Sequence, residues 1–267
     1  MLVLENINVI FGKGTPDENH ALKQICLKIE KGDFITVIGS NGAGKSTLLN
    51  VIAGTYQSAG GSISLISPAG AIDITKQSEY KRARFIGRIF QNPLLGTAGN
   101  MALADNMIIC EKKGYRGLKI SLNNAKRDIF RAQLKRLGLG LENRLRDNVG
   151  LFSGGQRQAL TLLMTIMSKP EVLLLDEHTA ALDPVNAEIV MNLTREFAKE
   201  NNLTVLMITH NMKHALETGN RLLMMDGGEI ILDINGKEKQ NLTLADLQQR
   251  FKAAKNKELA NDEILLT

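Results

Sequence analysis

Residues 39–47 combine the side chains and the spacing that could bind phosphate groups. They read Gly39-Ser40-Asn41-Gly42-Ala43-Gly44-Lys45-Ser46-Thr47 and fit the pattern G-x-x-x-x-G-K-S/T. The glycines let successive backbone N–H groups point at one centre, and a following helix adds the partial positive charge of its N-terminus. We expect Lys45 to reach the β- and γ-phosphates of a nucleotide and the Ser46 hydroxyl to hold Mg²⁺.

Two acidic residues follow an apolar run further along the chain. The run Val172–Leu175 leads directly into Asp176 and Glu177, so both carboxylates are expected at the carboxyl end of a parallel sheet, where α/β folds bind ligands. Asp176 suits the Mg²⁺ shell, and Glu177 could accept a proton from an attacking water. An isolated acidic pair more often caps a helix, and the phosphate-binding pattern is what favours catalysis here.

A third motif, Ser153-Gly154-Gly155-Gln156, opens a predicted helix upstream of the acidic pair. A Ser-Gly-Gly sequence at a helix N-terminus can form a second anion-binding end. Taken alone it is also typical of an ordinary capped helix start. Its place between the phosphate-binding pattern and Asp176 favours the functional interpretation.

The hydrophobic pattern predicts strands that alternate with helices and position these motifs. Strands are expected at 3–10, 25–29, 34–38, 63–66, 85–90, 172–175 and 204–208, with a hairpin at 221–233. Helices are expected at 45–53, 155–167 and 186–199, and 60–61 is expected to be a turn. Such alternation predicts an α/β fold with a mostly parallel sheet covered on both faces.

Between about residues 93 and 150 the pattern changes to uninterrupted helix, which predicts an inserted helical subdomain. Phe130, Leu134 and Leu137 fall on one helix face, with basic residues on another. The chain after Gly236 is polar and is expected to be largely helical.

Composition excludes several classes of protein. The 267 residues are 43% hydrophobic and 23% charged, which is ordinary for a soluble globular protein and excludes a fibrous or disordered chain. The sequence shows no bilayer-spanning run and no secretory signal. The two cysteines, Cys26 and Cys110, suit a reducing compartment, and Cys26 is expected in the core.

The net charge of +5 is unevenly distributed. Residues 112–146 hold 11 basic and two acidic residues, a local charge of +9. Our hypothesis is that this segment favours docking near anionic lipid rather than nucleic acid. A solvated basic helix face is the alternative.

Taken together, the motifs resemble those of the nucleotide-binding subunit of ATP-binding cassette (ABC) transporters, from Leu2 to about Gly236. Residues 39–47 match Walker A, 172–177 match Walker B, and 153–156 match the family signature. The resemblance implies roles for Gln91 as the Q-loop glutamine, Asp183 in the D-loop, His210 as the switch histidine and Phe11 as the aromatic that stacks on adenine. Two positions depart from the pattern, Phe152 for the usual Leu and His178 for the usual Pro.

That resemblance also implies a fold and an assembly. The fold would be a P-loop NTPase with a mostly parallel core sheet, an N-terminal antiparallel β-subdomain and the inserted helical subdomain. Residues 1–236 would form the ATPase domain, with the helical subdomain at about 93–150, and 237–267 a C-terminal tail.

In such an assembly two subunits would sandwich ATP and Mg²⁺, each site completed by the signature of the other subunit. Gln91 would join Ser46 and Asp176 around Mg²⁺. The pair, a homodimer or a paired ATPase subunit, would sit peripherally on the cytoplasmic face of the membrane and drive permease subunits, with an extracytoplasmic substrate-binding protein as an indirect partner.

The runs DEHTAALDP and GNRLLMMDGGEIILDINGKEK resemble ATPases of amino-acid uptake systems, tryptophan/tyrosine-type in particular. Alternatives stay open: an exporter ATPase, or a soluble ABC ATPase acting on nucleic acid or ribosomes. Chromosome-maintenance members carry long coiled coils between the Walker motifs, and ribosome-acting members usually carry two cassettes. A phosphate-loop kinase or GTPase would lack the signature and the Q-loop.

Overall fold

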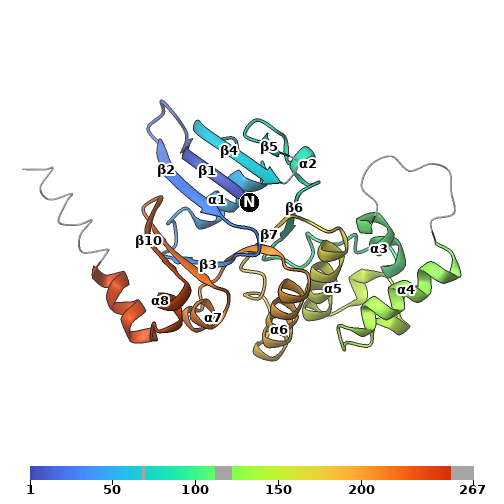
Figure 1. The fold of residues 1–267 in the computed structure, drawn as a ribbon. Coiled ribbons are helices and arrows are strands. Elements are labelled where there is room, and N and C mark those ends of the chain that lie inside the picture. The colour runs from blue at the N-terminus through green and yellow to red at the C-terminus, as the bar shows by residue number, and fades with distance from the viewer. Residues whose placement is uncertain (68–69, 112–121, 254–267) are drawn as a thin grey trace, which may run out of the picture. The chain divides into compact units, whose positions relative to one another are not determined.

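The computed structural model describes residues 1–67, 70–111 and 122–253. The chain divides into two compact units, one made of Met1–Arg82 with the described residues from Thr204 onward, the other of Ala83–Leu203. Antiparallel and parallel sheets with helices make this the mixed α/β fold that the sequence predicts (Figure 1).

In the first unit the described residues form two groups of strands. An antiparallel group has the order β2-β1-β4-β5, and a mostly parallel group has the order β10-β9-β3-β8. Helix α1 packs against both β2 and β3 (Figure 1). The elements of this unit are β1 (Leu2–Phe11), β2 (Asn19–Ile29), β3 (Phe34–Gly39), α1 (Lys45–Ala53), β4 (Gly60–Ser67), β5 (Gly70–Asp73), α2 (Glu79–Arg82), β8 (Thr204–Ile208), α7 (Met212–Glu217), β9 (Arg221–Asp226), β10 (Glu229–Asn235) and α8 (Gly236–Gln240).

Two expectations for the antiparallel group were wrong. Gly60 and Gly61 begin β4 instead of forming a turn, and the register slips between the pairs of Glu5 and Asn8. Gly61 has φ +87°, and a Cβ there would lie 2.3 Å from the Glu5 carbonyl oxygen, so the two glycines mark a β-bulge. Cys26 is exposed because its neighbours in β2 turn inward on the alternating strand.

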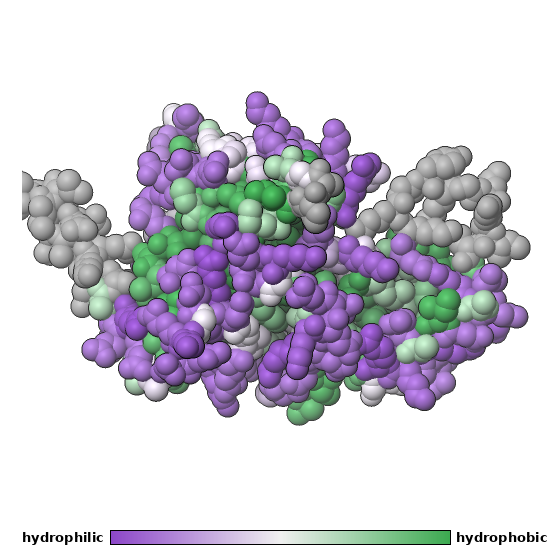
Figure 2. Space-filling view, viewed as in Figure 1, coloured by the Kyte–Doolittle hydropathy of each residue, from purple (hydrophilic) through white to green (hydrophobic). Residues whose placement is uncertain are grey.

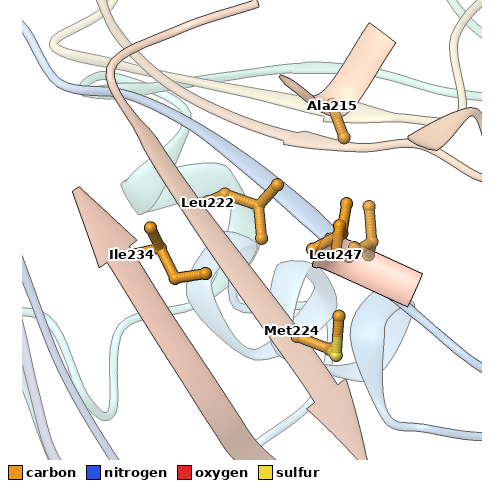
Figure 3. Packing of buried hydrophobic residues seen from close by; sticks show 6 residues of the cluster. Ala215, Leu222, Met224, Ile234 and Leu247 are labelled. Carbon is orange, nitrogen blue, oxygen red and sulfur yellow. The ribbon is translucent and has the colours of Figure 1, made fainter. Parts of the chain in front are cut away.

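An apolar cluster binds the C-terminal segment to the mostly parallel group of strands. Leu247 comes from a helix over residues 244–253 and lies against the strands and α7 (Figure 3). The buried members of the cluster are Ile38, Ala215, Leu222, Met224, Ile234 and Leu247. The described part of the tail is therefore helical and shares the core of the first unit.

Arg82 clamps the end of α1. It is 1% exposed, and its Nη1 donates to the carbonyls of Val51 and Ile52 at 2.6 and 2.9 Å. Its Nη2 and Nε donate to the carbonyls of Thr75 and Gln77 at 2.7 and 3.0 Å. The guanidinium therefore satisfies carbonyls at the C-terminus of α1, where the helix dipole also favours positive charge.

Lys239 is a second buried cation in this unit. It is 3% exposed, and its Nζ donates to the carbonyls of Thr218 and Gly219, the latter at 3.2 Å. No carboxylate within the described residues forms an ion pair with it, and burial lowers the pKa of Lys239 to about 8. The hydrogen bonds attach α8 to the turn that precedes β9.

This buried lysine predicts that stability rises with pH. Between about pH 8 and 10.5 the unfolded chain binds more protons at this site than the folded one, so the free energy of unfolding increases with pH. Between pH 8 and pH 10 the free energy of unfolding of the wild type, relative to that of Lys239→Met, should increase by on the order of 2–3 kcal/mol. Urea unfolding measures it. Lys237→Met changes an exposed lysine on the same helix and is the control. Its free energy of unfolding should differ from that of the wild type by the same amount at every pH. A pH-independent difference for Lys239→Met would contradict the prediction.

The described residues of the second unit form a parallel strand pair and four α-helices. Its elements are β6 (Ile86–Ile89), α3 (Leu103–Glu111), α4 (Asn124–Lys135), α5 (Gly154–Met167), β7 (Val172–Asp176) and α6 (Pro184–Glu200). Strands β6 and β7 pair in parallel, and α5 packs against β6, α3, α4 and α6. The expected uninterrupted helix at 93–150 was wrong, because loops and two short 3₁₀ turns at Leu141–Asn143 and Val149–Leu151 separate the helices.

Much of the positive charge at residues 122–146 is paired within this unit. Four of its basic side chains form ion pairs with acids of the same unit, namely Lys126–Glu111, Arg131–Asp128, Arg136–Glu200 and Arg144–Asp147. Residues 112–121, which carry the rest of the basic segment, lie outside the described part of the chain. Docking near anionic lipid stays a prediction.

The surface is mainly hydrophilic on the face drawn in Figure 2, where hydrophobic side chains gather in small groups. Among the described residues no helix combines the length and the apolar character needed to cross a bilayer.

Candidate functional site

The phosphate-binding pattern forms the expected strand–loop–helix in the first unit. Strand β3 ends at Gly39 and α1 starts at Lys45. A Cβ at Gly39 would lie 2.1 Å from the Met225 carbonyl oxygen, and Gly44, with φ +91°, would place one 2.5 Å from the Ala21 carbonyl oxygen. Glycine is therefore required at both ends of the loop. The N-terminus of α1 has no side-chain cap and no acid in its first turn, which suits an anionic ligand.

Lys45 curls back over this loop. Its side chain is 6% exposed, and Nζ donates to the carbonyls of Gly39 and Ser40 at 2.9 and 2.7 Å. Ser40 also donates its hydroxyl to Asp226 at the end of β9. These bonds fix the loop and hold an ammonium beside the N-terminus of α1, a geometry suited to phosphate oxygens.

His210 lies at the same edge of the first unit. Strand β8 runs parallel to β3, and the N–H of Thr209 donates to the Val37 carbonyl at 3.1 Å. The carboxyl ends of these two strands therefore carry the phosphate loop and an exposed histidine, as ligand sites of parallel sheets do.

Phe11 ends β1 and is 38% exposed. Its ring meets Tyr56 edge to face, with centroids 5.2 Å apart and an interplanar angle of 81°. Tyr56 was not predicted, although an aromatic residue just after α1 was the available signal. Part of each ring stays exposed to solvent, and a flat base could stack on that exposed surface.

The second unit brings Gln91, Asp176 and Glu177 together at one edge. Gln91 lies just after β6, Asp176 ends the parallel neighbour β7, and Glu177 comes directly after that strand. Arg88, on β6, forms an ion pair with Asp176 at 3.4 Å, with both side chains largely buried. Arg88 is a residue that sequence reasoning missed, since only the pairing of β6 with β7 reveals the contact.

The signature residues form a reciprocal cap at the start of α5. The hydroxyl of Ser153 accepts from the N–H of Gln156 at 3.2 Å, and the Gln156 side chain accepts from the N–H of Ser153 at 3.1 Å. This is a capping box, which stabilises the helix start. Phe152, which replaces the usual Leu, is 3% exposed, and the Arg144 guanidinium carbon lies 4.5 Å from the centroid of its ring. The Phe152 ring therefore fills a buried apolar site.

Asp183 caps α6 and connects to the signature through Asn186. Its carboxylate accepts from the N–H and the side-chain amide of Asn186 at 3.1 and 2.6 Å, and these bonds lower the pKa of Asp183. A Cβ at Gly155 would lie 2.6 Å from the Asn186 side chain. The signature needs glycine there because Asn186 packs directly against it.

Each unit offers an oxygen atom of the kind that Mg²⁺ binds. Ser46 is exposed in the first turn of α1, and Asp176 offers a carboxylate at the end of β7. The described residues contain no group of three or more His, Cys, Asp or Glu side chains that could hold a metal alone. In proteins Mg²⁺ usually keeps several waters and binds one or two carboxylates together with substrate phosphates.

Comparison with known proteins identifies the family. Residues 22–180, more than half of the chain, match the pattern of the ABC transporter family. The chain belongs to the ABC transporter ATP-binding family. The tyrosine transport ATP-binding protein of Clostridioides difficile (strain R20291) is 42% identical over 255 residues, which cover 95% of this chain and 100% of that protein. The macrolide export ATP-binding/permease protein MacB of Aggregatibacter actinomycetemcomitans is 35% identical over 236 residues, 87% of this chain and 34% of that protein.

Solved structures of ABC cassettes share the fold. A dimeric ATP-binding cassette in a post-hydrolysis state, bound to ADP and Pi, matches with a TM-score of 0.71 and 25% identity, covering 88% of this chain and 98% of that one. CbiO1 of Clostridium perfringens, part of the ABC transporter complex cbiONQ, matches with a TM-score of 0.73 and 27% identity, covering 93% of each chain. This ABC cassette is therefore an ATPase that binds ATP and serves a membrane transporter.

Proposed function

We propose that this ABC ATPase powers the import of an aromatic amino acid. The proposal is carried by the similarity to the tyrosine transport ATP-binding protein, which is 42% identical to this chain along its own whole length. A permease and an extracytoplasmic binding protein would select the substrate, and the cassette would work on the cytoplasmic face of the membrane.

Within each site, the motif residues would act on one ATP. Residues 39–47 would wrap the phosphates, Lys45 would neutralise the β- and γ-oxygens, and Phe11 would stack on adenine. Ser46, Asp176 and Gln91 would hold Mg²⁺, which when bound would draw charge from the phosphates. Glu177 would accept the proton of the attacking water, and His210 would contact the γ-phosphate.

A head-to-tail homodimer would complete the sites. Ser153, Gly154, Gly155 and Gln156 of one subunit would close on the phosphates held by the other, with Asp183 at the contact. The dimeric state of the cassette bound to ADP and Pi supports this arrangement. We also propose that residues 1–236 form the ATPase domain, that its helices at about 93–150 face the permease, and that 237–267 form a tail. ATP-driven closure and post-hydrolysis opening would then shift the permease between two orientations.

Uptake in the source cell tests the transport assignment. Deleting the gene should lower the initial uptake of radiolabelled tyrosine or tryptophan at least fivefold and leave leucine uptake unchanged. Wild-type protein should restore uptake, whereas Glu177→Gln, made to the same level, should not. Loss of leucine uptake instead would discard the aromatic assignment.

Export is the second candidate, because MacB is 35% identical over the cassette. The same deletion strain distinguishes it. An exporter ATPase would leave tyrosine uptake unchanged and slow the loss of a preloaded compound from the cell.

A further inference from the structure

Glu177 has an unusual backbone conformation. Its φ is +47°, in the left-handed region that non-glycine residues rarely adopt. Such a conformation persists only where the surroundings determine it, and it is concentrated at functional sites. The question is what holds the backbone there, since Glu177 sits between the strand end at Asp176 and an irregular turn.

His178 lies directly after it and is buried to 2% exposure. Its Nε2 is 3.1 Å from the hydroxyl oxygen of Thr194, within α6. The Thr194 hydroxyl donates its proton to the Val190 carbonyl at 2.8 Å. A hydroxyl has one proton to donate, so Thr194 acts as acceptor and the ring carries its proton on Nε2.

The backbone around His178 forms a closed turn. The N–H of Ala180 donates to the Glu177 carbonyl at 2.9 Å, and the N–H of Leu182 donates to the Thr179 carbonyl at 3.2 Å. Asp183 then caps α6. The turn is thus fixed at its far end by the helix cap, and the His178 side chain fixes its near end to the middle of the same helix.

We propose that His178 is a positioning residue for Glu177. By bonding to Thr194 it holds the Glu177 backbone in the left-handed conformation and so aims the carboxylate at the attacking water. The usual Pro of the family pattern restricts the backbone covalently, and His178 does so through a buried hydrogen bond. The inference rests on the proposed role of Glu177 as proton acceptor.

Thr194→Val tests the bond without changing the volume of the side chain. It removes the acceptor, and we expect kcat for ATP hydrolysis to fall about tenfold with KM for ATP within about twofold, since misplacing a reacting group by 1 Å can cost up to about a hundredfold. Thr194→Ser keeps the hydroxyl and is the matched control, with kcat expected within twofold of wild type. A wild-type kcat for Thr194→Val overturns the proposal.

A second pair serves if the Thr194 variants do not fold. Gln places an amide N–H near the position of Nε2, so His178→Gln should retain most of the rate that His178→Leu loses. Equal rates for these two variants overturn the proposal.

A double-mutant cycle separates positioning from simple loss of structure. In the Glu177→Gln background, Thr194→Val should not lower the residual hydrolysis further, because the group that it positions is already gone. A tenfold loss in both backgrounds would show a structural role and overturn the proposal. Failure of the proposed role of Glu177 as proton acceptor is distinguishable from this outcome, because it would appear as a wild-type rate of the Glu177→Gln single variant.

Discussion

Glu177→Gln is expected to keep ATP binding and to lose about 10²–10⁴-fold in ATP hydrolysis. The two side chains have the same shape, so the backbone and the neighbouring turn should be undisturbed. The amide cannot accept a proton at neutral pH, and the general-base contribution disappears. Steady-state phosphate release measures the rate, and titration with a fluorescent ATP analogue checks that affinity changes less than about threefold.

Glu171→Gln is the matched control for this variant. Glu171 is exposed and precedes the amino end of β7, the same strand that Glu177 follows at its carboxyl end. It should hydrolyse ATP at the wild-type rate. If Glu177→Gln also turns over at that rate, the role of Glu177 is wrong. Accumulation of an ATP-bound dimer by Glu177→Gln, seen as a doubled mass in light scattering, would support the proposed sandwich.

Elements that are buried on both faces could be predicted closely from the sequence. The expected strand 34–38 is β3 (Phe34–Gly39), the expected helix 45–53 is α1, and the expected strand 204–208 is β8. Continuous apolar, β-branched runs identify such strands. Because these same strands end in the motifs, the positions of Lys45 and His210 along the fold followed directly.

Elements with little burial could not be predicted, because they lack the hydrophobic pattern that identifies the buried ones. Strand β5 is exposed along its length, and α7 has six residues, so neither leaves a periodic hydrophobic signal. Cys26 was placed in the core by treating cysteine as an apolar residue, although the alternation of β2 assigns it to the outer face.

Contacts between distant segments could not be predicted from one sequence. The Arg88–Asp176 ion pair depends on the pairing of β6 with β7. The clamp of Arg82 on α1 depends on a loop that returns 30 residues later. Arg82 is buried and Arg88 largely so, and burial of a charge is favourable only when the fold supplies partners, which the local sequence does not reveal.

Lys45→Ala is expected to weaken ATP binding by about 10²–10⁴-fold. In the wild type the ammonium already lies over the loop, 2.9 and 2.7 Å from the carbonyls of Gly39 and Ser40, and little movement is needed to reach phosphate oxygens. Two hydrogen bonds from a charged group contribute about 1.5–3 kcal/mol each, and each 1.4 kcal/mol is about tenfold in affinity. Isothermal titration with ATP and Mg²⁺ measures the loss.

The control must separate loss of the phosphate contact from loss of a buried cation. Lys239→Met also removes a buried lysine of the first unit, one that bonds to carbonyls at the turn before β9 instead of to the phosphate loop. It should remove the part of the pH dependence of stability that Lys239 causes, and leave ATP affinity within about twofold of wild type. Tight ATP binding by Lys45→Ala would overturn the phosphate-loop assignment, and a matching loss in Lys239→Met would show that the buried charge, rather than the phosphate contact, controls affinity.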